Sequence, residues 1–141
     1  ITERHIQRHP MGSVTQIFRY FNVYGPEGEE HKGNQASPYM QFTKQAKETG
    51  VIKVFQNSDT YQRDFIHVSQ VVDYHLRFLN CKKSGVFNIG TGKAKSFQQV
   101  AEEISSKHNS KIEYVPMPDI LKPSYQKYTC ADMSKTLAAL N

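Results

Sequence analysis

The sequence predicts an α/β protein, because segments with strand patterns alternate with segments with helix patterns along its 141 residues. The run IFRYFNV at 17–23 is rich in aromatic and β-branched residues, which is typical of a buried strand. Apolar residues at 97–104 instead recur at the spacing of an amphipathic helix, and Ser96 with Gln99 forms a capping box before them. A chain of this length has room for one domain.

The beginning of the chain is expected to be irregular on both sides of its first strand. Residues 1–9 are polar and compatible with a helix, which Pro10 and Gly12 would end. Residues 24–34, YGPEGEEHKGN, contain three glycines and one proline, and this composition predicts a long loop.

A helix is expected to follow this loop. Ser37 suits its N-cap and Pro38 suits its first position. Gly50 suits the residue at which the helix ends, because glycine adopts the left-handed conformation of a C-cap easily. Three apolar residues at helical spacing are expected to face the core: Tyr39, Phe42 and Ala46.

The remaining elements continue the alternation. Short apolar runs predict four further strands, at 51–55, 64–68, 86–89 and 112–115. Two further helices are predicted, one capped by Ser69 and one capped by Asp132. The residues expected to face inward are Val72, Leu76 and Leu79 in the first helix, and Met133, Leu137 and Leu140 in the second.

Composition narrows the possible classes of protein. A net charge of +5 admits nucleic acid, anionic lipid or a phosphorylated small molecule as a partner. Cys81 and Cys130 are far apart in the sequence, which argues against a disulfide scaffold and against structural zinc. No apolar run approaches the roughly 18 residues of a membrane span and no signal peptide opens the chain. We therefore expect a cytoplasmic protein without a membrane partner.

Candidate binding residues lie in loops next to strands, where α/β proteins bind their ligands. Lys32 lies in the first such loop, and Arg63 and Tyr125 lie beside later strands. Arginine can donate two parallel hydrogen bonds to a phosphate, and a tyrosine ring can stack on a base. A phosphorylated ligand that carries a base fits these residues. The plain alternatives are a solvated Lys32, an ion pair between Arg63 and Asp64, and simple packing of Tyr125.

Two other patterns are weaker as sites. His5 and His9 have the i, i+4 spacing of metal ligands, but no third ligand lies near them in the sequence, so we expect no metal. The Gly90-Thr91-Gly92 sequence lacks the full glycine fingerprint and the Lys-Ser/Thr pair of phosphate-binding loops. It therefore predicts a tight turn at the end of a strand.

Three motifs taken together resemble one superfamily. They are FRYFNVYGP at 18–26, RDFIHVSQVVD at 63–73 and FNIGTG at 87–92. They are similar to the C-terminal half of the extended short-chain dehydrogenase/reductases that act on nucleotide sugars. The resemblance implies an α/β fold made of a substrate-binding lobe and the closing strands of a Rossmann-type sheet.

Longer stretches point to a narrower family. EEHKGNQASPY at 29–39 and YVPMPDILKPSYQKYTCADMS at 114–134 resemble the ADP-L-glycero-D-manno-heptose 6-epimerases, and VFQNSDTYQRDF at 54–65 aligns with their substrate loop. That family begins with a glycine-rich Rossmann domain and a catalytic Tyr-x-x-x-Lys, and residues 1–141 contain neither. The chain is thus expected to be a single substrate-binding fragment without the N-terminal Rossmann domain, and to be inactive alone.

The resemblance also implies roles for individual residues. Lys32 would be a catalytic acid/base, and it would share the nicotinamide side of NADP with Val23. Arg63 would hold the diphosphate of the substrate. The other implied substrate-binding residues are Asn22, Asn34, Gln41, Phe55, Gln56, Asn57, Ser58 and Tyr125.

The implied activity is that of an isomerase, which inverts carbon 6 of ADP-D-glycero-D-manno-heptose with NADP in lipopolysaccharide core synthesis. The implied partners are an ADP-sugar and further copies of the same enzyme. One alternative is another nucleotide-sugar epimerase or dehydratase, which the three general motifs fit equally well. The other is a non-catalytic module that binds nucleotide or nucleic acid. Lysine and arginine are scattered over the whole chain, which disfavours a nucleic-acid face.

Overall fold

The computed structural model describes residues 3–4, 8, 12–26 and 28–141, and it confirms the α/β class. The helix expected at 1–9 lies largely outside the described residues. No helix within the described ranges is long and apolar enough to cross a membrane. In chain order the elements are β1 (Gln16–Tyr20), β2 (Asn22–Tyr24), η1 (Glu30–Gln35), α2 (Pro38–Thr49), β3 (Val51–Phe55), β4 (Gln62–His67), α3 (Val68–Leu79), β5 (Gly85–Ile89), β6 (Ala94–Ser96), α4 (Phe97–His108), β7 (Lys111–Val115), η2 (Lys122–Ser124), β8 (Tyr128–Thr129) and α5 (Ser134–Leu140).

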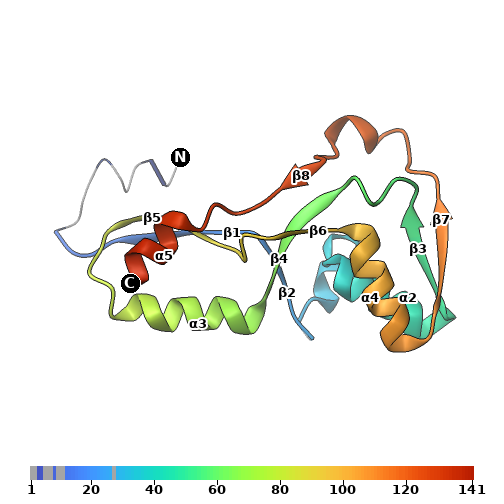
Figure 1. Cartoon of the computed structure of the whole chain (residues 1–141), viewed down its shortest axis with the longest axis horizontal. Coiled ribbons are helices and arrows are strands. Elements are labelled where there is room, and N and C mark those ends of the chain that lie inside the picture. The colour runs from blue at the N-terminus through green and yellow to red at the C-terminus, as the bar shows by residue number, and fades with distance from the viewer. Residues whose placement is uncertain (1–2, 5–7, 9–11, 27) are drawn as a thin grey trace.

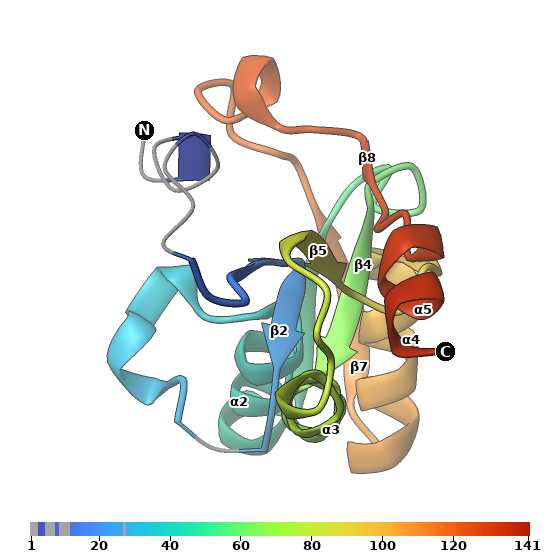
Figure 2. The ribbon, with the colours of Figure 1, turned by 90° about the vertical axis from the view of Figure 1, so that its left-hand side faces the viewer.

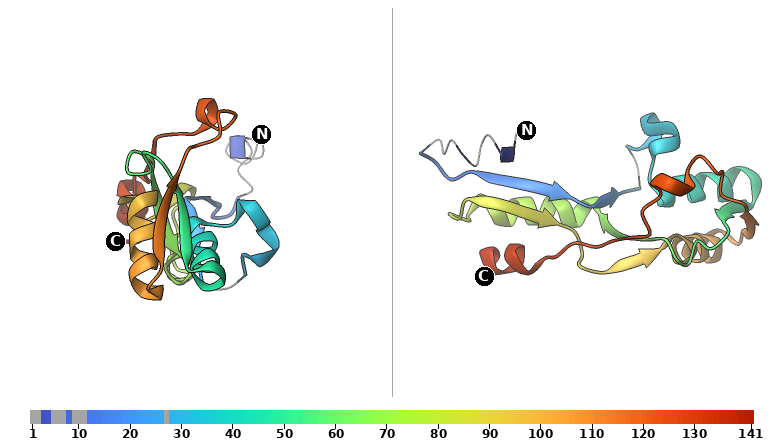
Figure 3. Two further views of the ribbon diagram at one scale, coloured as in Figure 1. Left: turned by 90° about the vertical axis from the view of Figure 1, so that its right-hand side faces the viewer. Right: turned by 90° about the horizontal axis from the view of Figure 1, so that it is seen from above.

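The elements form two packed regions on either side of a small middle sheet (Figure 1). At one end, β1 pairs with β5 in parallel and packs with α3 and α5. At the other end, β3 pairs with β7 in parallel and packs with α2 and α4. Between them, β4 pairs with β2 and β8 in parallel and with β6 in an antiparallel direction. Seen from above, the two regions lie at opposite ends of an elongated molecule (Figure 3).

The helix predicted after the first loop is confirmed in detail as α2. The Ser37 hydroxyl accepts a hydrogen bond from the Met40 N–H, and Pro38 is the first helical residue. Gly50 ends the helix with a φ of 70°, a conformation that residues with a Cβ rarely adopt. The three residues expected to face the core are all buried: Tyr39, Phe42 and Ala46.

The prediction of a single strand at 17–23 is wrong, because the chain forms two strands there. β1 pairs with β5, whereas β2 pairs with β4 in the middle sheet. Between the two strands, the Phe21 N–H donates to the Ile89 carbonyl at 3.0 Å. The chain thus passes from one sheet to the next within a single apolar run. Apolar character alone could not reveal this, since both halves of the run have strand patterns.

The helix predicted from Ser69 exists as α3, but its cap and its inward face were predicted wrongly. The helix begins at Val68, and the side chain of His67 caps it. The predicted inward residues are exposed, with exposed fractions of 52% for Val72, 58% for Leu76 and 75% for Leu79. Val71, Tyr74 and Phe78 contact the β1–β5 region instead. The helix is apolar on two sides, so its sequence does not indicate which side meets the sheet.

The last predicted helix exists as α5, but it begins one residue later than expected. It begins at Ser134, with Met133 rather than Asp132 at the N-cap. Met133 is buried and Leu140 is partly buried, as expected, but Leu137 is 44% exposed. The fully buried residue is Thr136, whose hydroxyl donates to the Asn88 carbonyl of β5 at 2.7 Å. A polar residue can occupy a core position when its hydrogen bond is satisfied there.

Asp64 joins the middle sheet to two loops. Its carboxylate is fully buried and accepts hydrogen bonds from the N–H and hydroxyl of Thr91 and from the N–H groups of Gly92 and Ala131. A Cβ on Gly90 would lie 2.7 Å from that carboxylate and 2.5 Å from the Ala131 Cβ, so only glycine fits. The Gly90–Gly92 turn is therefore a tight turn that binds the chain's own carboxylate.

Candidate functional site

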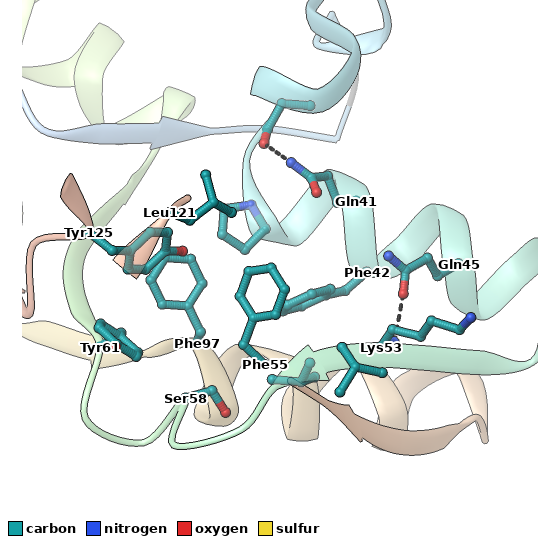
Figure 4. Close-up of a pocket in the computed structure, with 14 residues that line it drawn as sticks. Gln41, Phe42, Gln45, Lys53, Phe55, Ser58, Tyr61, Phe97, Leu121 and Tyr125 are labelled. Carbon is teal, nitrogen blue, oxygen red and sulfur yellow. Dashed lines mark hydrogen bonds between the residues drawn. The ribbon is translucent and has the colours of Figure 1, made fainter. Parts of the chain in front are cut away.

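A cavity of about 630 Å³ opens beside α2 and β3, and the proline-rich loop before β8 closes one side of it (Figure 4). Gln41 and Phe42 face it from α2, and Phe55 faces it from the end of β3. Leu121 and Tyr125 reach it from the proline-rich loop. A cavity of this size and mostly apolar lining is typical of a small-molecule site.

Aromatic rings form the wall of this cavity next to β4. Tyr125 contacts Tyr61 edge-on, with ring centroids 4.9 Å apart, and also packs against Phe97 at 5.9 Å and Phe55 at 6.5 Å. Burial raises the pKa of the Tyr125 phenol above its ordinary value, despite the nearby charge of Arg63, so the phenol stays neutral at neutral pH. Rings in such an arrangement can receive a flat aromatic group of a ligand.

Arg63 is held against this aromatic wall. Its guanidinium carbon lies 5.6 Å from the centroid of the Tyr125 ring and 5.7 Å from that of Phe97, at cation–π distance. One N–H donates to the Gln62 carbonyl at 2.8 Å. A guanidinium has five N–H donors, so this arrangement leaves donors with which to bind an anion. The alternative of an ion pair with Asp64 is wrong, because the Asp64 carboxylate binds Thr91, Gly92 and Ala131.

The turn after β3 brings one hydroxyl into the cavity lining. Asn57 adopts a φ of 60°, and its carbonyl accepts hydrogen bonds from the N–H and hydroxyl of Thr60. Ser58 is only 2% exposed, and its hydroxyl has no hydrogen-bond partner in the described part of the chain. A buried hydroxyl without a partner costs free energy unless a ligand or water satisfies it. Gln56 and Asn57 themselves are exposed beside the lining.

Lys32 lies outside the cavity lining, in the η1 segment that stands out beside β2 and α2 (Figure 2). Its ammonium is 3.7 Å from a carboxylate oxygen of Glu29, and its side chain is 42% exposed. Because η1 leads directly into α2, this loop ends at the helix that carries Gln41 and Phe42.

The structure thus separates the residues predicted for the site. It brings Gln41, Phe55, Ser58 and Tyr125 into the cavity lining, with Arg63 against Tyr125. It leaves the following outside that lining: Asn22, whose amide donates to the Asp64 carbonyl; Val23, which packs against the β1–β5 core; Lys32; Gln56; and Asn57. The side chain of Asn34 lies outside the described part of the structure.

Sequence reasoning missed two residues of the aromatic wall. Tyr61 and Phe97 belong to the aromatic wall. Phe97 matched the apolar face of α4, so its pattern indicated a core residue only. Tyr61 precedes Arg63 by two residues in a strand-like segment, and that spacing was the one available signal, since alternate residues of a strand share a face.

Comparison with known proteins decides the family. A sequence profile of the NAD dependent epimerase/dehydratase family matches residues 3–90, which is more than half of the chain. The chain belongs to this family. Its fold is likewise that of solved epimerases, and the chain spans less than half of their length.

Three solved epimerase structures illustrate the likeness. ADP-L-glycero-D-manno-heptose-6-epimerase from Helicobacter pylori is 27% identical, with a TM-score of 0.84 over 98% of this chain and 42% of that one. UDP-N-acetylglucosamine 4-epimerase from Methanobrevibacter ruminantium is 23% identical, with a TM-score of 0.83 over 99% and 44%. UDP-glucose 4-epimerase from Thermotoga maritima is 24% identical, with a TM-score of 0.80 over 99% and 44%. For the last two enzymes, the likeness to this chain concerns the fold alone.

Two features of the described residues bear on whether this epimerase-family chain could hold a nicotinamide dinucleotide. The backbone N–H groups of Thr91 and Gly92 bind Asp64, so the Gly90–Gly92 turn is no cradle for a diphosphate. Val23 lies in β2, an edge strand of its sheet as far as the chain is described, so one side of its backbone faces away from β4. Among the described residues no three metal-binding side chains gather, and His5 and His9 lie outside that part of the chain.

Proposed function

We propose that this chain forms the substrate-binding part of an NADP-dependent ADP-L-glycero-D-manno-heptose 6-epimerase. The observation that carries the proposal is the cavity, whose aromatic wall has an arginine packed against it and whose lining includes a serine hydroxyl without a partner among the described residues. The 27% identity to the Helicobacter pylori enzyme of that name supports the choice of substrate. A cytoplasmic homo-oligomer is part of the same proposal.

The proposed binding mode assigns each side of the cavity to a part of the nucleotide sugar. The rings of Phe55 and Tyr125 contact the base, because flat apolar surfaces suit stacking. Arg63 binds the diphosphate through its remaining N–H donors. The Ser58 hydroxyl satisfies its missing hydrogen bond on the ligand.

The proposed chemistry inverts a carbinol carbon whose proton is not acidic, so deprotonation of that carbon cannot start the reaction. A bound nicotinamide cofactor supplies the hydride acceptor and donor that a route through a ketone needs. This chain's part is to hold the sugar and to move the hydroxyl proton, for which Lys32 is the acid/base on one face. A tyrosine outside residues 1–141 would serve the other face. Because Lys32 lies beside α2 and outside the cavity lining, the reacting end of the sugar would extend from the cavity toward the Lys32 loop.

The exposed apolar side of α3 supports the inference that more protein belongs to the active enzyme. Val72, Leu76 and Leu79 lie on it, and each is more than half exposed. Contiguous exposed apolar residues usually mark a surface that another part of a protein covers. Such a cover would carry the remaining part of the cofactor site.

Thermal unfolding with different nucleotides tests the substrate. ADP at about a hundred times its Kd should raise the Tm of the complete protein by about 5 °C, because ligand binding to the folded state adds to its stability. UDP and dTDP at the same concentration should raise it by less. A larger shift with UDP or dTDP would point to another nucleotide-sugar epimerase or dehydratase. Salt-sensitive DNA binding without any nucleotide effect would replace the enzyme by a nucleic-acid module.

Removal of Arg63 should weaken nucleotide binding. Arg63→Ala should reduce the free energy of ADP binding by about 1.5–3 kcal/mol, the usual contribution of a hydrogen bond to a charged group. Arg63→Lys should recover only part of it, because lysine lacks the planar fork. Calorimetric titration of ADP at fixed ionic strength measures the ADP affinity of both variants.

Arg77 provides the matched control for this prediction. Its guanidinium lies over the Tyr74 ring at 5.9 Å, on α3 and far from the cavity. Arg77→Ala should therefore leave ADP affinity unchanged. Equal affinities for the Arg63→Ala and Arg77→Ala variants would show that Arg63 has a packing role alone.

A further inference from the structure

The loop that carries Lys32 is anchored by one buried carboxylate. Glu29 is 5% exposed, although it lies between the exposed residues Gly28 and Glu30. Acidic side chains are almost never buried to this degree unless they are paired or hydrogen-bonded. The contacts of this carboxylate therefore show what its burial achieves.

The Glu29 carboxylate connects the loop to the helix that follows it. One oxygen accepts a hydrogen bond from the Ser37 N–H at 2.7 Å, and the other accepts one from the Ser37 hydroxyl at 2.8 Å. Ser37 is the N-cap of α2, the helix that lines the cavity. The loop is thus tied to the start of α2 through a single side chain.

The same carboxylate faces Lys32. The oxygen that accepts from the Ser37 N–H lies 3.7 Å from the Lys32 ammonium, and the Lys32 N–H donates to the Glu29 carbonyl at 2.9 Å. Burial raises the pKa of the Glu29 carboxyl, but the hydrogen bonds from Ser37, the charge of Lys32 and the Gly25 N–H outweigh it and leave that pKa below its ordinary value. Glu29 is therefore ionised at neutral pH and attracts the ammonium.

We propose that Glu29 is a positioning residue that holds the Lys32 ammonium in a defined place relative to the substrate cavity. It does so by tying the Lys32 loop to the N-terminus of α2, so that the proposed acid/base and the cavity wall keep one geometry. This inference rests on the proposed function, in which Lys32 moves a proton. Errors of about 1 Å in the position of such a group can lower turnover by about a hundredfold.

Two substitutions in the complete protein separate this role from simple loop stability. Glu29→Gln keeps the size of the side chain and a carbonyl acceptor for the Ser37 N–H, but it removes the charge that attracts Lys32. Glu30→Gln is the matched control. It makes the same charge change one residue away, at an exposed carboxylate that accepts from the Gly28 N–H at 2.9 Å.

The first readout is the reactivity of Lys32 itself, which requires no enzyme activity. Acetic anhydride labelling, followed by mass spectrometry with the exposed Lys107 as the internal reference, reports how strongly the ammonium is held. Glu29→Gln should raise the labelling rate of Lys32 by about two- to fivefold, since exposed ion pairs contribute of that order. Glu30→Gln should leave the rate unchanged. Equal labelling in both variants would overturn the proposal.

The second readout is the division of the kinetic effect between kcat and KM. Glu29→Gln should lower kcat by about ten- to a hundredfold and leave KM and ADP affinity within about twofold of wild type. A loss of ADP affinity with kcat preserved would make Glu29 a support of the cavity and overturn the proposal. If the wild-type protein turns over no nucleotide sugar, the proposed function fails, and the labelling result alone then decides whether Glu29 holds Lys32.

Discussion

The Asp64→Asn variant is expected to lose about 3 kcal/mol of the free energy of unfolding, which is a large effect for one isosteric substitution. One oxygen of the carboxylate accepts from the N–H and hydroxyl of Thr91, and the other accepts from the N–H groups of Gly92 and Ala131. In either orientation, the asparagine NH₂ would meet at least one backbone N–H that can only donate. Urea unfolding followed by circular dichroism measures the loss.

Asp73→Asn is the control for this substitution. Asp73 is exposed on α3, so the same change of charge and atoms should alter the free energy of unfolding by less than about 0.5 kcal/mol. If Asp64→Asn were as stable as Asp73→Asn, the carboxylate would not be the link between the middle sheet and the Gly90–Gly92 turn.

The Lys32→Met variant of the complete enzyme is expected to lose about 10²–10⁴ in turnover, the usual contribution of a positioned acid or base. Methionine keeps the length of the side chain but cannot move a proton. Substrate affinity should stay within a few fold of wild type, because Lys32 lies outside the cavity lining. Steady-state kinetics with both epimers measures the loss of turnover, and calorimetric titration of ADP measures the affinity. The epimers should become unequal, since only one of the two faces loses its proton-transfer group.

Lys44 is a suitable control for the loss of a charge. It lies exposed on α2, where its only described ion pair is a long one with Glu48 at 4.0 Å. Lys44→Met should turn over like wild type. Near wild-type epimerisation by Lys32→Met, or a loss of binding alone, would mean that Lys32 is a charge near the phosphates, and the scheme with two acid/base groups would then be abandoned.

Part of the candidate site could be predicted from the sequence, because its residues occur in motifs that resemble those of nucleotide-sugar epimerases. Phe55, Ser58, Arg63 and Tyr125 come from separate segments, and the structure gathers them around one cavity. Tyr61 escaped prediction, since its spacing of two residues from Arg63 was the one signal and did not by itself indicate a site. The burial of Glu29 also escaped prediction, because a buried acid in a loop of glutamates looks like any other solvated charge.

The features that the sequence by itself determined are those that depend on short-range patterns along the chain. The alternation of strands and helices, the limits of α2 and the presence of a tight turn at Gly90–Gly92 are visible in patterns of residues close in the chain. A serine at an N-cap or a glycine at a C-cap acts on its own backbone, so its effect is visible without the rest of the fold.

The tertiary structure alone decided which partner each apolar segment meets. The run at 17–23 divides between two sheets, and α3 turns Val71 and Phe78 rather than Val72 toward the core. Both choices depend on strands far away in the sequence, so no local pattern contains them. The same holds for the Asp64 carboxylate, whose partners lie 27 to 67 residues further along the chain, and in part for Glu29, whose partner Ser37 lies 8 residues further. A buried charge is stable only where folding brings its hydrogen-bond donors together, and that depends on the whole path of the chain.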